Sequence, residues 1–486
     1  MSTRATALFA LTPKAFWVWG RVLLTAGLVF GLLLVLLVAW TGSSSLALIF
    51  TVALVALMGV VYLFKRPTLN LFIVLVGFVV IADNEAGFQF REILYGLYLY
   101  SLLAHWYITR CFFYRERFLL TPEDKALFLF LLLLPFTIPL TILFNGSLLG
   151  VASEFFSLSL LALYFPLKET CTRYRHGPQA LLLVVVCIGV LVAMRNMLNY
   201  QQMLSNVTQA WQVVTGRVVT NDNLLMVTSL FSLTLLIFTR RWWSFGIMLG
   251  CFLLCFAGLI LTQSRGYWLA FLLGALVMFF LIETRYRKRM LLLGGLGLAA
   301  LIGLGFAFFG AYMDLLLGGL LDRFTSVGSA ATTDISLINR FREAKTVMGH
   351  VVKNPVLGYG MGVSYTFYDI AHQATDYDAL VHNGYVGLWY KFGLWGLGLM
   401  LFFWARTIWR GVQAFLMKQG SSWMRLCGLT GALSLIAFTL STITSNPFFL
   451  KDSLFIFSVA AGLAGGAYQR GLLEQRRRAG NAEVQR

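Results

Sequence analysis

Residues 265–289 read RGYWLAFLLGALVMFFLIETRYRKR, and this stretch decides the class of fold. Between Arg265 and Glu283 the side chains are uncharged and mostly apolar, which is typical of a helix that crosses a bilayer with about 20 residues. A run of cations follows at once: Arg285, Arg287, Lys288 and Arg289. Because Lys and Arg gather on the cytoplasmic side of membrane helices, the stretch predicts a span that begins outside and ends inside the cell.

The composition of the whole chain agrees with this reading. Of its 486 residues 59% are hydrophobic and 12% are charged, whereas a soluble domain carries about 25% charged residues. The 42 Phe, 19 Tyr and 13 Trp exclude a disordered chain, since disordered segments are poor in aromatic residues. We therefore expect an all-α protein, a polytopic bundle of transmembrane helices.

The same template, applied along the chain, predicts about 12–14 spans. They fall near 19–40, 46–64, 68–82, 93–113, 125–144, 149–167, 179–198, 223–239, 243–262, 265–283, 290–312, 384–405, 424–443 and 449–468. Alternating these spans places most of the 38 basic residues on one side, so both termini are predicted to be cytoplasmic. The net charge of +18 then reflects topology and anionic inner-leaflet lipid rather than nucleic acid.

Four regions follow from this map. Residues 1–312 form an N-terminal transmembrane bundle of about 11 spans, and residues 313–383 form a large outer loop. Residues 384–470 hold the C-terminal transmembrane helices, and residues 471–486 are a basic cytoplasmic tail. Long ordered loops are usually functional, so we expect any chemistry at the outer face.

An amphipathic helix is predicted over residues 334–353 of the outer loop. Its apolar positions, spaced by three and four, are Leu337, Phe341, Ala344, Met348 and Val351. We expect this helix to lie at the outer membrane–water boundary. It either covers the bundle as a lid or presents Arg340 or Arg342 to an anionic head group. The alternating glycines of residues 358–362 are either a tight turn or a close approach to a ligand.

Three further residues at the predicted outer face are candidates for chemistry. His382 immediately precedes a span and is either a general base or a hydrogen-bonded structural histidine. Arg265 and Arg217 lie at or just before span starts, where an arginine is costly without an anionic partner. They either bind phosphate, which suits the planar guanidinium, or extend to the membrane interface. The acid pairs Asp83/Glu85 and Asp376/Asp378 are common spacings, and we expect no metal site.

Several of these motifs together resemble the O-antigen ligase family, a superfamily that includes O-antigen polymerases. The matching segments are RFREA (340–344), NPVLGYGMG (354–362), HNGY (382–385), FGLWG (392–396), TQSRGYWL (262–269) and GRVVTNDN (216–223). The resemblance implies a metal-independent glycosyltransferase of the GT-C type without a cofactor, in the bacterial inner membrane with a periplasmic active site. The donor would be a glycan on undecaprenyl diphosphate, and the acceptor a sugar hydroxyl of the lipid A core.

Carried onto this sequence, the resemblance implies roles for individual residues. Arg217 and Arg265 would bind the donor diphosphate, with Arg340 or Arg342 contributing, and His382 would activate or orient the acceptor hydroxyl. The physics agrees, because fixed arginines can stabilise a departing diphosphate without a metal. Two alternatives stay open. A polymerase would use the same donor with a second lipid-linked glycan as acceptor, and a flippase or transporter would move the glycan without forming a bond.

Overall fold

A computed structural model describes residues 67–81, 90–114, 117–205, 221–310, 318, 335–370, 373–418 and 420–484. The chain divides into two compact units, and each is described by itself. One comprises Met1–Val74 with Ile93–Phe118, and the other comprises Leu75–Glu92 with Leu119–Arg486. The predicted spans near 19–40 and 46–64 lie outside the described residues, so the total number of spans stays a prediction.

The described part of the first unit holds parts of two helices, since the unit ends at Val74 and resumes at Ile93, and both residues lie within a helix. Helix α3 (Pro67–Ile81) begins at a proline, and α4 (Phe90–Ile108) continues into a π-helical turn, η1 (Thr109–Phe113). Inside this unit the Tyr95 hydroxyl donates a hydrogen bond of 2.9 Å to the carbonyl of Val74, a residue of α3. The two helices cover the predicted spans near 68–82 and 93–113.

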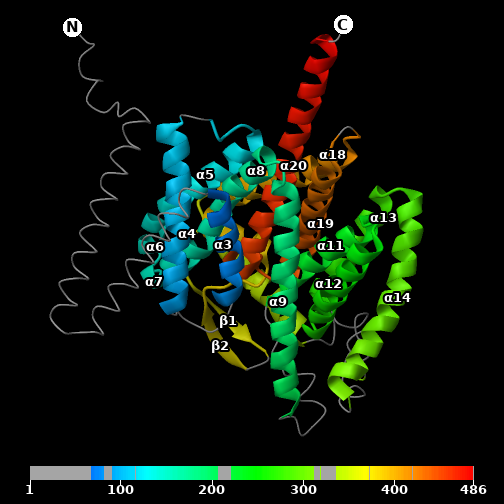
Figure 1. The fold of residues 1–486 in the computed structure, drawn as a ribbon. Helices are drawn as coiled ribbons and strands as arrows, with labels where there is room; N and C mark the ends of the chain where they lie inside the picture. Colours follow the sequence, from blue (N-terminus) through cyan, green and yellow to red (C-terminus); the bar gives the residue numbers. More distant parts are fainter. Residues whose placement is uncertain are drawn as a thin grey trace, which may run out of the picture. The chain divides into compact units, whose positions relative to one another are not determined.

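The second unit carries the remaining described elements, and its helices cover every predicted span from residue 125 onward (Figure 1). Its first half contains α5 (Pro122–Phe136), α6 (Ile138–Leu143), α7 (Leu148–Ser159), η2 (Leu160–Leu163), α8 (Tyr164–Arg173), α9 (Gly177–Ser205), α11 (Asp222–Phe238), α12 (Trp242–Leu261), α13 (Arg265–Leu281) and α14 (Thr284–Phe309). Its second half contains α17 (Ile335–Lys353), β1 (Tyr365–Asp369), β2 (Ala374–Asp378), α18 (Gly384–Leu416), α19 (Ser422–Thr444), η4 (Pro447–Phe449) and α20 (Lys451–Val484).

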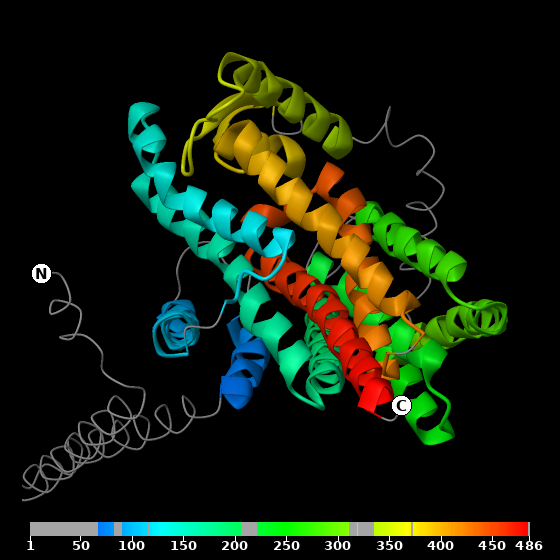
Figure 2. The ribbon, with the colours of Figure 1, turned by 90° about the horizontal axis from the view of Figure 1, so that it is seen from above.

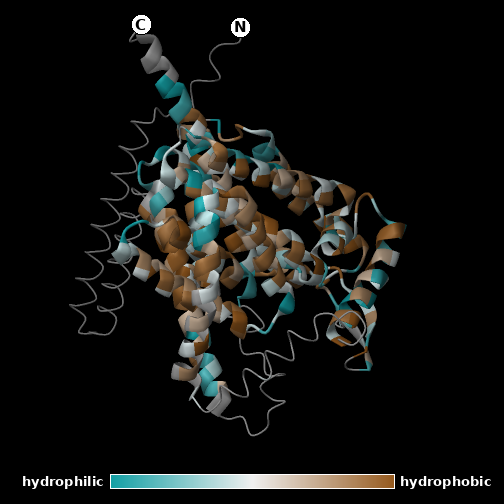
Figure 3. Ribbon diagram, turned by 90° about the vertical axis from the view of Figure 1, so that its right-hand side faces the viewer, coloured by the Kyte–Doolittle hydropathy of each residue, from teal (hydrophilic) through white to brown (hydrophobic). Residues whose placement is uncertain are grey.

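Six of the described helical segments are long and apolar enough to cross a membrane. They are Pro122–Leu143, Leu148–Arg173, Gly177–Met203, Trp242–Leu261, Gly384–Leu416 and Ser422–Thr444. Two shorter apolar helices, α11 and α13, join them, and hydrophobic residues predominate in the middle of the bundle in Figure 3. The predicted all-α, polytopic membrane fold is confirmed.

The core of the second unit forms where α11, α18, α19 and α20 pack together. Nearly all of α11 is buried, from Asn223 to Ile237. Small residues allow the other three helices to approach closely: a Cβ added at Gly411 of α18 would lie 2.7 Å from the carbonyl of Gly428 in α19. A Cβ added at Gly431 would meet the Ala460 carbonyl of α20 at 2.5 Å. Such close backbone contact is typical of helix association inside membranes.

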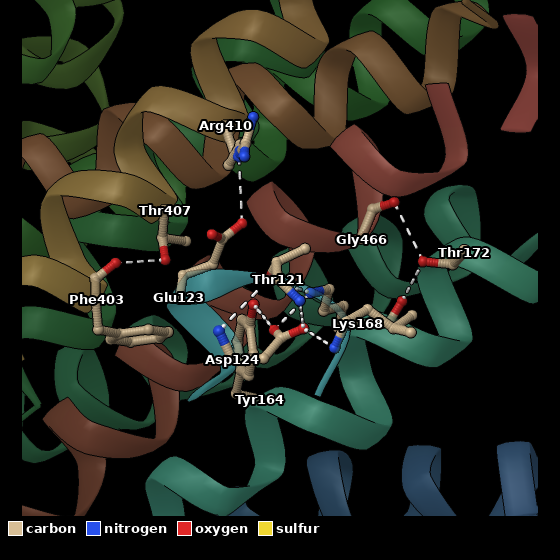
Figure 4. Close-up of polar contacts among 11 residues, drawn as sticks. Thr121, Glu123, Asp124, Tyr164, Lys168, Thr172, Phe403, Thr407, Arg410 and Gly466 are labelled. Atoms are coloured by element: carbon tan, nitrogen blue, oxygen red, sulfur yellow. Dashed lines mark hydrogen bonds and ion pairs between the residues drawn. The ribbon is translucent and has the colours of Figure 1, made fainter. Parts of the chain in front are cut away.

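A closed polar cluster joins α5, α8 and α18 near the C-terminal end of α18 (Figure 4). The Asp124 carboxylate accepts hydrogen bonds from Lys168 Nζ at 2.5 Å and from the Tyr164 hydroxyl at 2.8 Å. Glu123 lies 3.3 Å from Nε of Arg410. Both carboxylates are almost completely buried, so each charge depends on its protein partner rather than on water.

Helix α17 and the antiparallel hairpin of β1 and β2 form a small layer at the other end of α18, where α17 lies beside the start of that helix (Figure 2). The amphipathic helix is confirmed at Ile335–Lys353. The predicted apolar face is only partly right, because Phe341 is 51% exposed while Glu343 is buried with Val347 and Val351. The face turned inward includes a carboxylate because that carboxylate has buried hydrogen-bond donors. The hairpin was not expected from the sequence.

Candidate active site

The start of α18 fixes the position of His382. Asn383 caps this helix, since its side-chain oxygen accepts hydrogen bonds of 3.1 Å from the backbone N–H groups of Tyr385 and Val386. Asparagine is among the preferred residues at this position because its side chain satisfies N–H groups that the helix leaves unpaired. His382 is the residue immediately before the cap, so it is held at the mouth of the bundle rather than within the span.

The carboxylate of Glu343 in α17 contacts both the backbone and the imidazole ring of His382. His382 Nδ1 lies 2.8 Å from Glu343 Oε2, and the backbone N–H of His382 donates to Oε1 at 3.1 Å. The Tyr365 hydroxyl of β1 also hydrogen-bonds to Oε1. The Glu343 side chain is 2% exposed, whereas the His382 side chain is 38% exposed. A buried carboxylate therefore orients a histidine that remains open to the outside.

This arrangement defines what the imidazole can do. A carboxylate beside Nδ1 favours the tautomer with the proton on that nitrogen and stabilises the imidazolium that forms on protonation. Nε2, on the far edge of the ring, is then the nitrogen that can accept a proton. Burial, with the adjacent Glu343 carboxylate, raises the pKa of Tyr365 well above its ordinary value, so the phenol stays protonated and continues to donate.

The C-terminal end of α19, residues 443–446, is the point at which the candidate residues meet. Helix ends carry carbonyls without intrahelical partners, and here they are satisfied from other elements. Arg340 Nη1 donates to the Thr444 carbonyl at 2.6 Å, and Asn383 Nδ2 donates to the Ile443 carbonyl at 3.0 Å. In return, Asn446 Nδ2 donates to the carbonyl of Val381 at 2.7 Å. Arg340 and His382 are thus anchored to the same turn.

The first turn of α13 contacts this same end of α19 and brings Arg265 to it. A Cβ added at Gly266 would lie 2.8 Å from Thr444 Oγ1, so the glycine allows the two helices to approach closely. One residue further, the Tyr267 hydroxyl donates to Ser445 Oγ at 2.8 Å. Arg265, the first residue of α13, therefore lies at the α13–α19 junction, to which Arg340 is also bonded.

Not every predicted site residue joins this group. Arg217 lies outside the described residues. Arg342 is exposed, and at about 100° per residue it is turned by roughly 200° from Arg340 around α17. The sequence left Arg340 and Arg342 as equal alternatives, and the structure places only Arg340 against α19. Asp378 Oδ1 accepts from the N–H of Leu380 and so closes the turn after β2.

The glycines of residues 358–362 form a turn that packs into the bundle. Gly358, Gly360 and Gly362 all have positive φ, at 73°, 93° and 68°, which a residue with a side chain rarely adopts. A Cβ at Gly360 would lie 2.8 Å from the carbonyl of Thr137. The N–H of Gly360 donates to the Lys391 carbonyl at 3.0 Å, next to the break in α18 at Gly393, where φ is 64°. The turn thus supports the broken start of α18.

A buried ion pair between α7 and α18 holds the same turn in place. Lys391 Nζ lies 2.9 Å from Glu154 Oε1 and donates to the Val363 carbonyl at 2.6 Å. Glu154 Oε2 accepts from the N–H of Gly362 at 3.1 Å. The Lys391 side chain is fully buried. These contacts tie α7, the glycine turn and the first half of α18, which follows His382 in the chain, to one another.

Sequence reasoning missed Glu343 and Tyr365. Glu343 was not among the residues predicted to face inward, because only apolar positions were used to choose the inner face of the helix. A signal was available, since a carboxylate within a predicted lid helix is the natural partner for a histidine at the same membrane face. Among the described residues, no three His, Cys, Asp or Glu side chains gather closely enough to hold a metal ion.

The segment that carries most of these residues was compared with known protein families. Residues 250–401 match the O-antigen ligase family. The match runs from α12 to the first half of α18 and includes Arg265, Arg340, Glu343 and His382. No curated protein sequence matches the chain significantly. The resemblance expected from the motifs between residues 262 and 396 is confirmed, and the match supports an enzyme similar to the O-antigen ligase and polymerase family that acts in a membrane. The motif GRVVTNDN (216–223) lies outside the matched segment.

Proposed function

We propose that this protein is an O-antigen ligase that transfers a glycan from undecaprenyl diphosphate to a sugar hydroxyl of the lipid A core. The observation that carries the proposal is the Glu343–His382 pair, which lies at the α19 end that also contacts Arg340 and the start of α13. The family match at residues 250–401 supports the glycan substrate class. The reaction takes place at the periplasmic face of the inner membrane.

In this mechanism His382 Nε2 accepts the proton of the acceptor hydroxyl. The oxygen then attacks the anomeric carbon of the donor sugar, and the bond between that carbon and the diphosphate oxygen breaks. The electron pair leaves with the diphosphate. Glu343 stabilises the imidazolium through Nδ1, and a positioned base of this kind accelerates a reaction by about 10²–10⁴-fold.

The arginines act on the leaving group. Negative charge grows on the departing diphosphate, and guanidinium groups at the membrane edge stabilise it through paired hydrogen bonds without a metal. Arg265 and Arg340 fill this role among the described residues, and Arg217 is proposed as a third ligand. We propose Arg340 rather than Arg342, because Arg340 is bonded to Thr444 of the shared α19 end.

The first experiment is a gel of lipopolysaccharide and of lipid-linked glycan from a strain that lacks this protein. A ligase leaves long glycan chains on undecaprenyl diphosphate and a bare lipid A core. A core that carries a single repeat unit instead identifies a polymerase. Unchanged lipopolysaccharide, or glycan transport without bond formation in proteoliposomes, would overturn the proposal.

Variants then test the site in the same strain. Glu343→Gln keeps the shape of the side chain but removes the negative charge that stabilises the imidazolium, so we expect roughly a hundredfold slower transfer in membranes. His350→Ala is the matched control, since His350 also lies in α17 and contacts the rings of Tyr359 and Tyr390. Equal activity of Glu343→Gln and His350→Ala would contradict the proposed role of the pair.

A further inference from the structure

A strongly basic surface lies at the end of the bundle opposite the candidate active site. Helix α13 begins at Arg265 beside α19 and ends at Leu281, one turn before this surface. The α11–α12 and α13–α14 junctions meet there, because α14 contacts both α11 and α12 and the rings of Phe238 and Tyr286 lie 4.5 Å apart. The basic residues of the two junctions are Arg240, Arg241, Arg285, Arg287, Lys288 and Arg289.

Two of these arginines converge on one phenol. Arg285 Nη2 donates to the Tyr286 hydroxyl at 2.6 Å, and Arg240 reaches the same oxygen from the other junction. Burial alone would raise the pKa of Tyr286, yet the two guanidinium groups lower it below its ordinary value. In the described part of the chain, no carboxylate forms an ion pair with Arg240 or Arg285. Two like charges held together favour a bound anion between them.

The aromatic residues beside these arginines indicate the depth of the surface in the membrane. Trp242 and Trp243 are each 69% exposed and their rings lie 3.7 Å apart. Exposed tryptophans next to a span are enriched at the level of the lipid head groups. At this depth the anion within reach of Arg240 and Arg285 would be a lipid phosphate.

The first turns of α14 supply an apolar surface directly beyond the basic residues. Leu291 and Leu292 are 66% and 64% exposed, and nothing lies within 4 Å of a Cβ added at Gly294 or Gly295. Helix α14 lies at the edge of this unit in Figure 1. A charged site that continues into open apolar surface fits an amphiphile, with its head at the arginines and its acyl chains along α14.

We propose that Arg240, Arg285 and Tyr286 form a binding site for the phosphate of an anionic phospholipid of the inner leaflet. Arg287 has a different role, since it donates to the carbonyls of Ile282 and Phe280 and caps the end of α13. A bound lipid neutralises the two converging arginines, and its acyl chains cover the exposed apolar surface of α14. The site is separate from the chemistry at His382 and does not depend on the proposed transfer reaction.

Native mass spectrometry of the full-length protein in a nonionic detergent tests the proposal. The protein is titrated with phosphatidylglycerol, and zwitterionic phosphatidylcholine serves as the comparison lipid. We expect the double variant Arg240→Gln/Arg285→Gln to bind phosphatidylglycerol roughly thirtyfold more weakly. Each surface cation contributes about a fivefold gain in affinity for anionic lipid, and the two losses multiply. Tyr286→Phe, which keeps the ring against Phe238, should weaken binding severalfold and serves if the double variant unfolds.

The matched control is Arg476→Gln/Arg477→Gln, which removes two exposed charges from the end of α20. This control should bind phosphatidylglycerol as the unaltered protein does. Equal weakening in both double variants would overturn the proposal, because it would mean that lipid binding depends only on the total charge of the protein. Displacement of the lipid by inorganic phosphate would also overturn it, since the site would then recognise a small anion rather than an amphiphile.

Discussion

Two buried carboxylates lie near opposite ends of α18, and they differ in the partner that holds them. Asp124, near the C-terminal end, pairs with Lys168, whose side chain is 6% exposed. Glu343, at the start of the helix, pairs with His382, whose side chain is 38% exposed. The first pair is closed to solvent on both sides. The second is closed on the carboxylate side and open on the histidine side.

We propose that the difference separates a structural contact from a chemical one. A lysine normally keeps its charge near neutral pH and holds a carboxylate permanently, whereas a histidine gains and loses a proton in that range. A buried carboxylate behind an exposed imidazole can therefore support proton transfer, while a buried carboxylate behind a buried ammonium can only hold helices together. The expected effects of substitutions at the two ends follow from this distinction.

The largest effect is expected at the open end. His382→Ala removes the proposed base and should lower the rate of glycan transfer in membrane vesicles by about 10²–10⁴-fold. His350→Ala, which alters a histidine of the same outer layer, should stay within about threefold of the unaltered protein, because small losses of packing leave the transition state intact. Full activity of His382→Ala would show that the Glu343–His382 pair is structural, like the Asp124–Lys168 pair.

At the Asp124–Lys168 pair, we expect substitutions to change the stability of the protein rather than its rate of transfer. Lys168→Met leaves the Asp124 carboxylate buried without a cation, which should lower the free energy of unfolding by roughly 3–5 kcal/mol. Arg173→Met in the same helix is the control, since its pair with Glu169 has a 49% exposed arginine and should contribute about 0.5 kcal/mol. Thermal unfolding in detergent measures both. Transfer by the folded fraction should be unchanged, and a rate loss at full stability would contradict the structural assignment.

Much of the fold could be predicted because membrane helices follow a simple rule. Runs of about 20 apolar residues must be helical in lipid, and every such run predicted within the described residues is covered by a helix. The hairpin of β1 and β2 escaped notice because its strands have only five residues each. Alternation over so short a stretch, YTFYD, is a weak signal without knowledge of the partner strand.

The site was predictable only in part for a related reason. His382 and Arg265 stand at span boundaries, so their positions in sequence already place them at the membrane surface. Glu343 acts through residues distant in the chain, Tyr365 and His382, and no local pattern shows which side of α17 faces them. Phe341 was expected to be inside and is exposed, because three hydrogen bonds to the Glu343 carboxylate fix the rotation of the helix.

The arginine pair on α17 sharpens the comparison within one helix. Arg340→Ala removes the guanidinium that is bonded to Thr444 and should lower transfer roughly a hundredfold, as expected for the loss of one donor to a developing anion. Arg342→Ala, on the opposite face, should stay within about twofold. The measurement is the rate of transfer at saturating and at limiting donor. A greater loss in Arg342→Ala would show that the outer face of α17 meets the diphosphate.

The smallest effect is expected at Tyr365, which acts on His382 only through Glu343. Tyr365→Phe removes one hydrogen bond to the carboxylate and should slow transfer by about three- to tenfold. The decisive measurement is the double variant with Glu343→Gln. If the phenol works through the carboxylate charge, Tyr365→Phe adds little in that background, because the two residues belong to one chain of contacts. If the two losses multiply instead, Tyr365 contributes by packing the hairpin, and the orienting network ends at Glu343.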